Sequence, residues 1–509
     1  MADLLPDQLR LMAEHHPDEV AFTNVATDAS LTFAEWDQRS NRLARWLVDQ
    51  GIAKGDRVAI HLPPEEPDRF LVAYAAVHKA GAAAVPTSTR LVTRELAFVL
   101  GHAGTVVALT GTSTLPALLA ACPDLPELRT VVTTGPTDAE TSADLVPWDE
   151  AEIDDDSVFQ VPVDGSDVAD IMYTSGTTGR PKGVVVRHGT IALIPNGLPR
   201  WSGQGWLHSS PMFTFAGIAS AYNPMKLGLT LLYLPRFDVD AWFDAVEQRR
   251  PSATFLVPAM AELLLASPRF EAADLSSITL CPLGSAPLAP ATFDALRAKL
   301  PQAMVSNSWG MTEAGPAFCI MPPDQVERRV GSVGMPVPPV QFRIVDADGT
   351  ELPAGTVGEL LVHNPGRERE YFRDPEATAR TWQDGWLHTG DLAELDEDGF
   401  LYLRGREKDV IIRGGNNVHA TDVESVLYEH PAVQEAAVAA VPHAVLGEDV
   451  AAWVVLAPGA DGADATADDL RAFCAERLSD YKVPRTWTFL DELPRNATGK
   501  VVKRDLPGR

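Results

Sequence analysis

Hydrophobic residues follow two spacings along this chain: short apolar runs, and longer segments in which an apolar residue returns every third or fourth position. The short runs predict buried strands, and the longer segments predict amphipathic helices. DRVAIHL at 56–62 and TLLYLP at 230–235 are runs of the first kind, and a helical pattern follows each of them, the second beginning near Val239. This alternation continues through almost the whole chain and predicts an α/β fold with largely parallel sheets.

Two helix starts carry a capping signal. Thr32 and Glu35 have the spacing of a capping box before a helical segment that contains Trp36, and Gly51 follows as the residue that closes this helix. Thr421 and Glu424 have the same spacing near the C-terminus, so we expect Thr421 to open a second helix.

The order of elements changes near residue 405, and a compact unit follows from Asp409 onward. The chain then reads as a strand, a glycine turn (RGGNN), a helix, the strands AAVAAV and AAWVVLA, and a last helix with Leu470, Phe473 and Leu478 on one face. This stretch of about a hundred residues has the size of a small domain. We predict a large N-terminal domain of stacked mixed or parallel sheets with helices, residues 1–407, and a small mobile α+β C-terminal lid domain, residues 408–509.

Composition and charge limit the possible partners. The chain has 509 residues, of which 45% are hydrophobic and 22% charged, as in ordinary soluble proteins. Asp and Glu number 70 against 42 Lys and Arg, which gives a net charge of -28. Such a charge disfavours binding to nucleic acid or to anionic lipid, so we expect no nucleic-acid partner. Any anion that binds must be held by local groups.

The sequence also bears on location and on cysteine chemistry. No stretch is long and apolar enough to suggest a membrane span, and the first twenty residues lack a basic start followed by an apolar block. We therefore expect a cytoplasmic protein. Cys122, Cys281, Cys319 and Cys474 form no C-x-x-C pair, which argues against a disulfide framework and a zinc site and favours buried free thiols.

Residues 173–183 read YTSGTTGRPKG and directly follow an apolar run. Their glycines and lysine do not have the spacing of the Walker P-loop. Glycines nevertheless let a backbone approach an anion closely, and hydroxyls and a cation can bind it. The alternative is a polar surface loop, which the density of donors after a buried strand disfavours. The groups concerned are Thr174, Ser175, Thr177, Thr178 and Lys182.

This stretch is similar to the phosphate-binding signature of the adenylate-forming superfamily, which includes acyl-CoA synthetases, luciferases and the adenylation domains of peptide synthetases. SWGMTEAG at 308–315, the segment 385–409 and PRNATGKVVKRD at 494–505 resemble further motifs of that family in the same order. The resemblance extends over essentially the whole chain, from LTFAEWDQRSNRLA to NATGKVVKRDL.

The resemblance implies an ATP site. Trp309, where the family more often has Tyr, would stack on adenine, Thr312 would contact the α-phosphate, and Glu313 would hold Mg2+. Asp391 would accept hydrogen bonds from the ribose hydroxyls, and Arg406 would lie beside the ribose and phosphate. His388 replaces an Arg common in the family and is given no role. The full predicted ATP or AMP set is Thr174, Ser175, Gly176, Thr177, Thr178, Gly179, Lys182, Trp309, Gly310, Met311, Thr312, Asp391, Arg406 and Lys500.

Three C-terminal residues match positions of the family that serve its two half-reactions. Lys408 corresponds to the hinge between the large domain and the lid, and Gly415 to the glycine that lines the pantetheine tunnel. Lys500 corresponds to the lysine that neutralises charge as the carboxylate meets the α-phosphate. The predicted catalytic residues are Lys500, Lys182, Thr178 and Glu313.

The segment HSSPMFTFAGI at 208–218 resembles the family segment beside the acyl pocket. Thr214 stands where the family usually has His, so the gating role given to that His does not transfer. Peptide-synthetase domains that bind amino acids place an Asp in this neighbourhood, and the FTFAG segment has none, which disfavours an amino acid substrate. Core packing is the alternative for these residues. The predicted acyl pocket contains Phe213, Thr214, Phe215, Gly217, Gly284, Ser285 and Ala286.

The resemblance implies an AMP-forming acid–thiol ligase that uses ATP, Mg2+ and coenzyme A. A carboxylate, already ionised near neutral pH, would attack the α-phosphorus, and a thiolate would then attack the acyl adenylate. The acid is expected to be apolar, as in fatty acid and lipid metabolism. One alternative is an acyl-AMP ligase that loads a carrier protein. A luciferase-like monooxygenase and a non-catalytic nucleotide-binding protein are more remote, and the second would be expected to lack Lys500 or Glu313.

Overall fold

The computed structural model describes residues 4–135, 141–174, 180–192, 194–286, 288, 290–315, 319–457, 465–496 and 500–509. The chain forms two compact units. The first comprises Met1–Thr254, Met311–Pro316 and Gly366–Arg380, and the second comprises Phe255–Gly310, Ala317–Pro365 and Thr381–Arg509. The domain boundary predicted between residues 407 and 408 lies within the second unit and stays a prediction.

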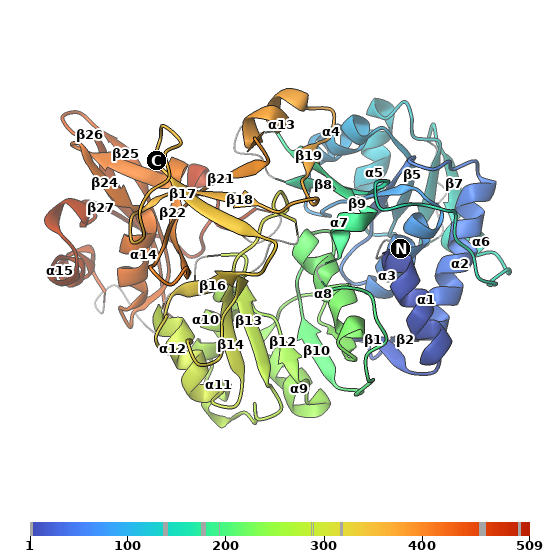
Figure 1. Ribbon diagram of the computed structural model, residues 1–509, viewed down its shortest axis with the longest axis horizontal. Helices are drawn as coiled ribbons and strands as arrows, with labels where there is room; N and C mark the ends of the chain where they lie inside the picture. The colour runs from blue at the N-terminus through green and yellow to red at the C-terminus, as the bar shows by residue number, and fades with distance from the viewer. Residues whose placement is uncertain are drawn as a thin grey trace. The chain divides into compact units, whose positions relative to one another are not determined.

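An eight-stranded sheet forms the centre of the first unit (Figure 1). Neighbouring strands from β8 to β7 run parallel, whereas β9 is antiparallel to β8 and β19 is antiparallel to β9. The predicted α/β class is therefore confirmed. The strand order is β19 (Glu370–Tyr371), β9 (Lys182–Arg187), β8 (Val168–Thr174), β4 (Ala83–Pro86), β3 (Arg57–His61), β5 (Thr105–Thr110), β6 (Thr130–Thr133) and β7 (Asp144–Pro147).

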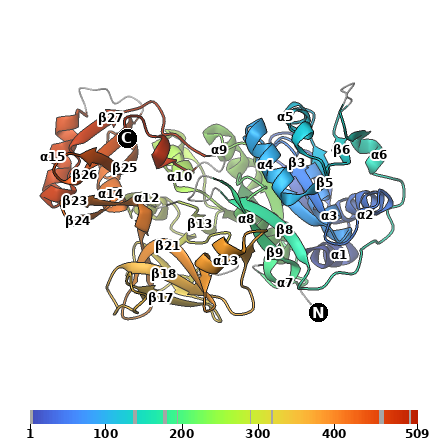
Figure 2. The same ribbon diagram turned by 90° about the horizontal axis from the view of Figure 1, so that it is seen from above.

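Helices cover both faces of this sheet. Helices α2 (Phe33–Asp49) and α3 (Pro67–Lys79) lie on one face, and α4 (Thr93–Ala103) and α5 (Leu115–Ala121) lie on the other (Figure 2). Alternate side chains of a strand point to opposite faces, so Val58 and Ile60 of β3 pack with α2 and α3 while Ala59 packs with α4 and α5. Both faces of the sheet are therefore buried.

The start of α2 confirms the predicted capping box. Thr32 Oγ1 accepts a hydrogen bond of 3.1 Å from the Glu35 amide, and Glu35 Oε2 accepts one of 2.8 Å from the Thr32 amide. Gly51 follows the helix with a φ of +79°, a left-handed conformation that glycine adopts without steric cost.

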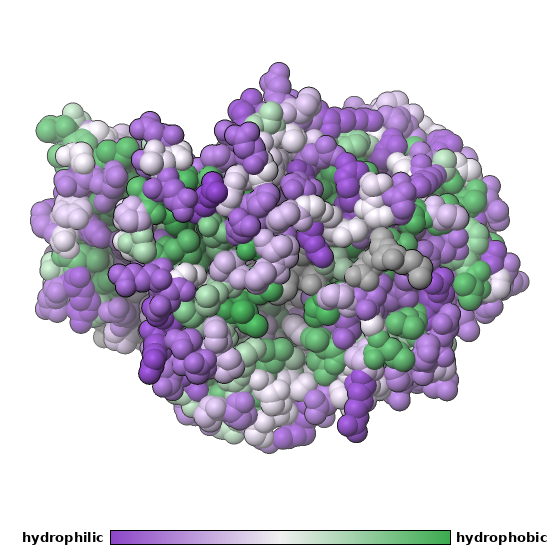
Figure 3. Space-filling model, viewed as in Figure 1, coloured by the Kyte–Doolittle hydropathy of each residue, from purple (hydrophilic) through white to green (hydrophobic). Residues whose placement is uncertain are grey.

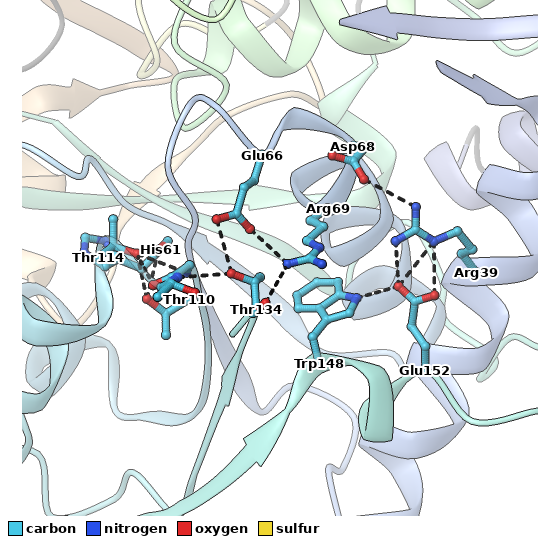
Figure 4. A network of polar contacts seen from close by, with 12 residues as sticks. Arg39, His61, Glu66, Asp68, Arg69, Thr110, Thr114, Thr134, Trp148 and Glu152 are labelled. Carbon is cyan, nitrogen blue, oxygen red and sulfur yellow. Dashed lines mark hydrogen bonds and ion pairs between the residues drawn. The ribbon is translucent and has the colours of Figure 1, made fainter. Parts of the chain in front are cut away.

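Polar contacts join the loops that follow the parallel strands (Figure 4). The carbonyl oxygen of His61 accepts hydrogen bonds from Thr110 Oγ1 at 3.2 Å and from Thr114 Oγ1 at 2.8 Å. Thr134, after β6, donates from its hydroxyl to Glu66 Oε1 at 3.2 Å. These bonds link the ends of three neighbouring strands, β3, β5 and β6.

A second sheet in the first unit contains strands β12, β10, β11, β1 and β2 in that order. Strand β11 is followed by α9, which begins at Val239, so the helix expected after TLLYLP is confirmed. The elements are β12 (Ala253–Thr254), β10 (Gly205–His208), β11 (Thr230–Tyr233), β1 (Val20–Asn24), β2 (Ser30–Thr32), α1 (Leu5–His15), α8 (Phe215–Lys226) and α9 (Val239–Arg249). Short helices α6 (Trp148–Ala151) and α7 (His188–Ile191) and helix α13 (Pro375–Thr381) complete the named helices of this unit.

The second unit contains an antiparallel sheet and a parallel strand pair. The sheet has the order β15 (Cys319–Ile320), β16 (Ser332–Pro336), β22 (Leu401–Arg406), β21 (Trp386–Leu395), β18 (Gly358–His363) and β17 (Gln341–Val345), with β20 (Trp382–Gln383) on β21. The parallel pair is β13 (Leu280–Gly284) and β14 (Met304–Ser308). Helices α10 (Pro258–Ala266), α11 (Arg269–Ala272) and α12 (Pro290–Lys299) belong to the same unit.

The C-terminal part of the second unit has the predicted α+β elements. Strands β24 (Asn416–His419), β23 (Val410–Arg413), β26 (Gly447–Leu456) and β25 (Val433–His443) form a sheet, and β27 (Thr486–Phe489) runs parallel to β26. Helices α14 (Ala420–Tyr428) and α15 (Ala467–Arg477) pack on it, with Leu470 buried and Phe473 and Leu478 half-buried.

The predicted capping role of Thr421 and Glu424 is wrong. His419 precedes α14 without a side-chain cap, and Thr421 Oγ1 instead donates to the Arg404 carbonyl at 2.9 Å. Glu424 Oε1 accepts from the Val438 amide at 2.8 Å and pairs with Lys503 at 2.8 Å. Both side chains bind groups far along the chain, which the local spacing could not indicate.

The surface agrees with the acidic, polar composition. Figure 3 shows polar residues over most of the visible face, with apolar residues in small scattered groups. No helix within the described residues combines the length and the apolar character needed to cross a membrane. All four cysteines are free thiols; Cys122, Cys281 and Cys474 are buried as expected, and Cys319 is half-buried.

Candidate active site

The predicted phosphate-binding stretch connects β8 to β9. Thr174, the last residue of β8, is the register partner of Lys182, the first residue of β9, so the antiparallel ladder holds the two ends of the stretch together. Ser175, Gly176, Thr177, Thr178 and Gly179 lie outside the described residues, and their phosphate-binding roles stay predictions.

Glu313 lies against this strand pair. Thr174 Oγ1 donates a hydrogen bond of 3.1 Å to Glu313 Oε1, although 139 positions separate the two residues. The hydroxyl of Tyr371 donates to the same oxygen at 3.3 Å. The ammonium nitrogen of Lys182 lies 4.7 Å from the centre of the Tyr371 ring. The structure thus brings together three residues that the sequence predicted for one site, Thr174, Lys182 and Glu313.

Arg369 binds the turn that contains Thr312 and Glu313. Its guanidinium donates to the carbonyl of Thr312 and, at 3.4 Å, to the carbonyl of Thr190. Gly315 has a φ of +63°, and a Cβ there would lie 2.9 Å from Arg369 Nε, so both the backbone conformation and the nearby guanidinium favour glycine. Burial lowers the pKa of Arg369 to about 10, against the opposing effects of Asp170 and Glu313, so the group remains cationic at neutral pH.

The sequence interpretation missed Arg369 and Tyr371. Both lie in or beside the short strand β19, which pairs with β9 through Tyr371↔Val184 and Glu370↔Val185. A pairing between strands so far apart in the chain leaves no local pattern. The available signal was the placement of an arginine and a tyrosine just before the helix start at Pro375, and by itself it indicates no role.

In the second unit, Asp391 lies between Trp309 and Arg406. Trp309 Nε1 donates to Asp391 Oδ2 at 2.9 Å, and Arg406 Nε lies 2.9 Å from Oδ1. Asp391 and Arg406 are register partners across β21 and β22, which fixes their spacing. Asp391 is buried, and each carboxylate oxygen can accept a further hydrogen bond. The three residues predicted for adenine and ribose therefore lie together.

Residues 310–312 continue from this group into the first unit. Gly310 is exposed, and a Cβ added to it would meet no atom within 4 Å, while Met311 and Thr312 are half-buried. The carbonyl of Met311 accepts a hydrogen bond of 3.1 Å from the Ala314 amide, which closes a tight turn. Only four positions separate Trp309 from Glu313.

Lys408, Gly415 and Lys500 all belong to the second unit. Lys408 lies in a single 3-10 turn, Glu407–Asp409, where burial and the neighbouring Arg406 lower its pKa, opposed by Asp409. Gly415 occupies the turn between β23 and β24 with a φ of +85°, which favours glycine on backbone grounds alone. Lys500 is exposed, and its amide donates to Asn496 Oδ1 at 2.9 Å. The predicted hinge, tunnel and catalytic roles stay predictions.

The predicted acyl-pocket residues fall into two groups. Phe213, Thr214, Phe215 and Gly217 lie at the start of α8 in the first unit, and Gly284, Ser285 and Ala286 follow β13 in the second. Thr214 caps α8: its hydroxyl accepts from the Gly217 amide at 3.0 Å and donates to the Pro211 carbonyl at 2.8 Å.

At two of the predicted pocket positions, Gly217 and Gly284, neighbouring backbone leaves little space for a side chain. A Cβ on Gly217 would lie 2.0 Å from the Pro211 carbonyl oxygen, and one on Gly284 would lie 2.9 Å from the Ser308 carbonyl oxygen. Phe215 is half-buried, and the guanidinium carbon of Arg369 lies 4.6 Å from the centre of its ring. The start of α8 is therefore joined to the turn of Thr312 and Glu313 through Arg369.

The Glu313 group fits a magnesium ion bound with a nucleotide. A carboxylate is a suitable hard ligand, and Mg2+ commonly takes one or two carboxylates and completes its shell with phosphate oxygens and water. Glu313 offers that carboxylate beside a hydroxyl and an ammonium group. His388, for which the sequence predicts no role, is half-buried, and its Nδ1 donates a hydrogen bond of 2.9 Å to Glu359 Oε2.

Comparisons with known proteins agree with this site. The model of the AMP-binding enzyme family matches residues 9–372, and that of the AMP-binding enzyme C-terminal domain matches residues 422–500. A feruloyl-CoA synthase of Amycolatopsis sp is 36% identical over 494 residues, covering 94% of each chain. The fatty acid–acyl-carrier-protein ligase ScoC of Streptomyces coeruleorubidus is 32% identical, covering 98% of this chain and 94% of its own.

A solved structure, ATP-bound MatB from Rhodopseudomonas palustris, superposes with a TM-score of 0.85 at 31% identity and covers 99% of this chain and 98% of its own. The family models together cover most of the chain, and they include the residues from Thr174 to Tyr371 that form the Glu313 group. The chain therefore belongs to the AMP-binding enzyme family, within the adenylate-forming superfamily that its motifs resemble.

Proposed function

We propose that this protein is an AMP-forming ligase that joins an apolar carboxylic acid to the thiol of coenzyme A. The observation that supports the proposal most directly is the meeting of Thr174, Lys182 and Glu313, a hydroxyl, a cation and a carboxylate from three separate segments. Such a set suits a metal-bound polyphosphate, for which catalysis is mainly positioning and charge neutralisation.

In the first half-reaction, a carboxylate oxygen of the acid attacks the α-phosphorus of ATP, the bond from that phosphorus to the bridging oxygen breaks, and pyrophosphate leaves. Glu313 would hold the magnesium ion, which supplies positive charge to the phosphate oxygens. Lys182 binds phosphate oxygens, Thr312 contacts the α-phosphate, and Lys500 neutralises charge at the attacking carboxylate. The acid needs no general base because it is already ionised.

We propose that the Trp309 group binds the nucleoside of the same ATP molecule. Trp309 and Glu313 are four positions apart, so at most about 14 Å of extended backbone separates them. Trp309 would contact adenine, and Asp391 and Arg406 would contact ribose. The buried Asp391 oxygens can each accept one more hydrogen bond, which suits a pair of hydroxyl donors.

In the second half-reaction, a thiolate sulfur attacks the acyl carbon, and the bond from that carbon to the AMP oxygen breaks. We infer that Gly415 lies along the approach of the thiol and that rotation about Lys408 exchanges Lys500 for this glycine. The acid is proposed to be apolar and to lack an amino group. Phe213 and Phe215 at the start of α8 support an apolar pocket.

A carrier-protein thiol is the second candidate acceptor, and the 32% identity to ScoC, a carrier-protein ligase, supports it. Pyrophosphate exchange into ATP with a panel of fatty, aromatic and amino acids tests the first half-reaction, and later addition of CoA or of a phosphopantetheinylated carrier protein separates the acceptors. We expect exchange with apolar acids and thioester formation with CoA. Pyrophosphate exchange with none of the acids would overturn the ligase assignment. Acyl transfer only to the carrier protein would overturn the proposal that CoA is the acceptor.

A further inference from the structure

Tyr371 contacts two groups of opposite charge at the proposed metal and phosphate site. Its hydroxyl donates to Glu313 Oε1 at 3.3 Å, and its ring centre lies 4.7 Å from Lys182 Nζ. We propose that Tyr371 is a positioning residue: its hydroxyl orients the Glu313 carboxylate toward Mg2+, and its ring holds the Lys182 ammonium for phosphate. This inference rests on the proposed function.

The hydrogen bonds to Glu313 converge on one oxygen. Thr174 Oγ1 and the Tyr371 hydroxyl both donate to Oε1, at 3.1 and 3.3 Å. Within the described part of the chain, Oε2 receives no hydrogen bond. Hydrogen bonds to one oxygen of a ligating carboxylate fix its orientation and leave the other oxygen for the metal. Glu313 is thus held with Oε2 as the metal-ligating atom.

The ring of Tyr371 stays fixed because its backbone is part of the sheet. Tyr371 pairs with Val184 of β9, two residues after Lys182, and its amide donates to Thr378 Oγ1 at 2.9 Å. The side chain is buried, with 9% of the residue exposed. A buried aromatic ring attracts an ammonium group placed over its face. The sheet therefore sets the position of the ring, and the ring limits where the Lys182 ammonium can lie.

Tyr371 also accounts for the separation of the two charges. Lys182 and Glu313 both contact Tyr371, yet neither forms an ion pair with any residue in the described ranges. A direct pair between them would have to break before either could bind a ligand. With Tyr371 contacting each, the cation remains available for phosphate oxygens and the carboxylate for a metal ion.

The hydroxyl and the ring can be tested separately by two substitutions. Tyr371→Phe keeps the ring and removes the donor to Glu313, whereas Tyr371→Leu removes both. Tyr428→Phe is the matched control, because the hydroxyl of Tyr428, the last residue of α14, donates to the backbone carbonyl of Ala436 at 3.5 Å. Thermal melting of each variant first establishes that it is folded.

The measurement is calorimetric binding of α,β-methylene-ATP, a non-reacting analogue, with Mg2+ in excess and again with EDTA. In EDTA, we expect Tyr371→Phe to bind the analogue as tightly as the wild type does. The increase in affinity that Mg2+ causes should be about fivefold smaller in this variant than in the wild type, as for the loss of one hydrogen bond. Tyr371→Leu should also bind about threefold more weakly in EDTA because Lys182 loses its aromatic contact. Tyr428→Phe should match the wild type in both buffers.

The inference is overturned if Tyr371→Phe keeps the full effect of Mg2+, or if it loses affinity equally with and without Mg2+, which is the result of a general structural role. The binding test does not depend on turnover. The wild-type protein could bind the analogue more tightly with Mg2+ and yet show no acid-dependent pyrophosphate exchange. That result would contradict the proposed function, but the binding data would still test the role of Tyr371.

Discussion

The indole Nε1 of Trp309 donates a hydrogen bond of 2.9 Å to Oδ2 of Asp391. Where the family more often has Tyr, this chain thus has a side chain that reaches the carboxylate proposed for ribose. Trp309 also meets Phe342 edge to face, with ring centres 6.0 Å apart and an interplanar angle of 89°. The hydrogen bond to Asp391 and the ring contact with Phe342 therefore fix the position of the indole. Trp309 and Arg406 together orient the Asp391 carboxylate.

Replacing Trp309 separates its two proposed contributions. Trp309→Phe keeps an aromatic ring but removes the donor to Asp391, and we expect the KM for ATP to rise about threefold to tenfold. Trp309→Ala also removes stacking on adenine and should raise KM by a further tenfold or so. Steady-state kinetics with ATP varied provides the measurement. Trp487→Phe, whose indole donates to the Pro484 carbonyl at 3.2 Å, is the control and should leave KM unchanged.

Thr214 should act as a helix cap. Its hydroxyl bonds the Gly217 amide and the Pro211 carbonyl, so Thr214→Ala should lower the free energy of unfolding by about 1 kcal/mol. Thr214→Ser keeps the hydroxyl and should retain most of that stability. Denaturant unfolding of the three proteins gives the comparison. An Ala variant as stable as the wild type would show that the cap contributes nothing.

His61 should make the protein less stable in mild acid. Its ring is buried, with Nδ1 2.9 Å from Thr87 Oγ1, and burial lowers its pKa to about 4. In the unfolded chain, the His61 imidazole takes up a proton near the ordinary histidine pKa of about 6.5. Between these values the unfolded state binds more protons, so stability present above about pH 6.5 is lost as pH falls, by up to about 1.4 kcal/mol per unit.

His61→Asn should therefore lose less stability than the wild type between pH 7 and pH 5. Urea unfolding at each pH measures the difference. His15→Asn, at the exposed end of α1, serves as the control. Equal pH dependence of wild type and His61→Asn would mean that His61 is protonated at the same pH in the folded and unfolded chain.

Lys500 and Gly415 should serve different half-reactions. We expect Lys500→Ala to slow adenylation about a hundredfold to a thousandfold, the usual loss for one transition-state donor, and to spare thioester formation from supplied acyl-AMP. Gly415→Leu should show the reverse. Gly447→Leu is a control for backbone strain, because Gly447 has a φ of +79° and no atom within 4 Å of an added Cβ. Equal loss of both half-reactions in both variants would contradict a two-state lid.

The sequence could predict features that depend on neighbouring residues. The capping box of Thr32 and Glu35 depends on two residues only three positions apart and forms as expected. The strand before the phosphate-binding stretch and the helix at Val239 likewise follow from local hydrophobic spacing. Thr421 and Glu424 have the same local spacing, but the Arg404 carbonyl, the Val438 amide and Lys503 bind their side chains instead. A local rule is not obeyed where such distant partners exist.

The residues of the candidate site likewise divide into those that the sequence could identify and those that it could not. Thr174, Lys182, Glu313, Trp309 and Asp391 could be named because they lie in ordered motifs that resemble a family. Tyr371 and Arg369 could not, since their contacts depend on β19 joining the edge of β9 and on a glycine turn that admits a guanidinium.

The most direct test of the central claim follows the oxygen atoms of the acid. A carboxylate labelled with heavy oxygen is incubated with ATP, Mg2+, CoA and the enzyme, and the products are analysed by mass spectrometry. If the carboxylate attacks the α-phosphorus, AMP retains one labelled oxygen after the thiol has taken the acyl group. Unlabelled AMP, or label in inorganic phosphate with ADP as the nucleotide product, would contradict the account.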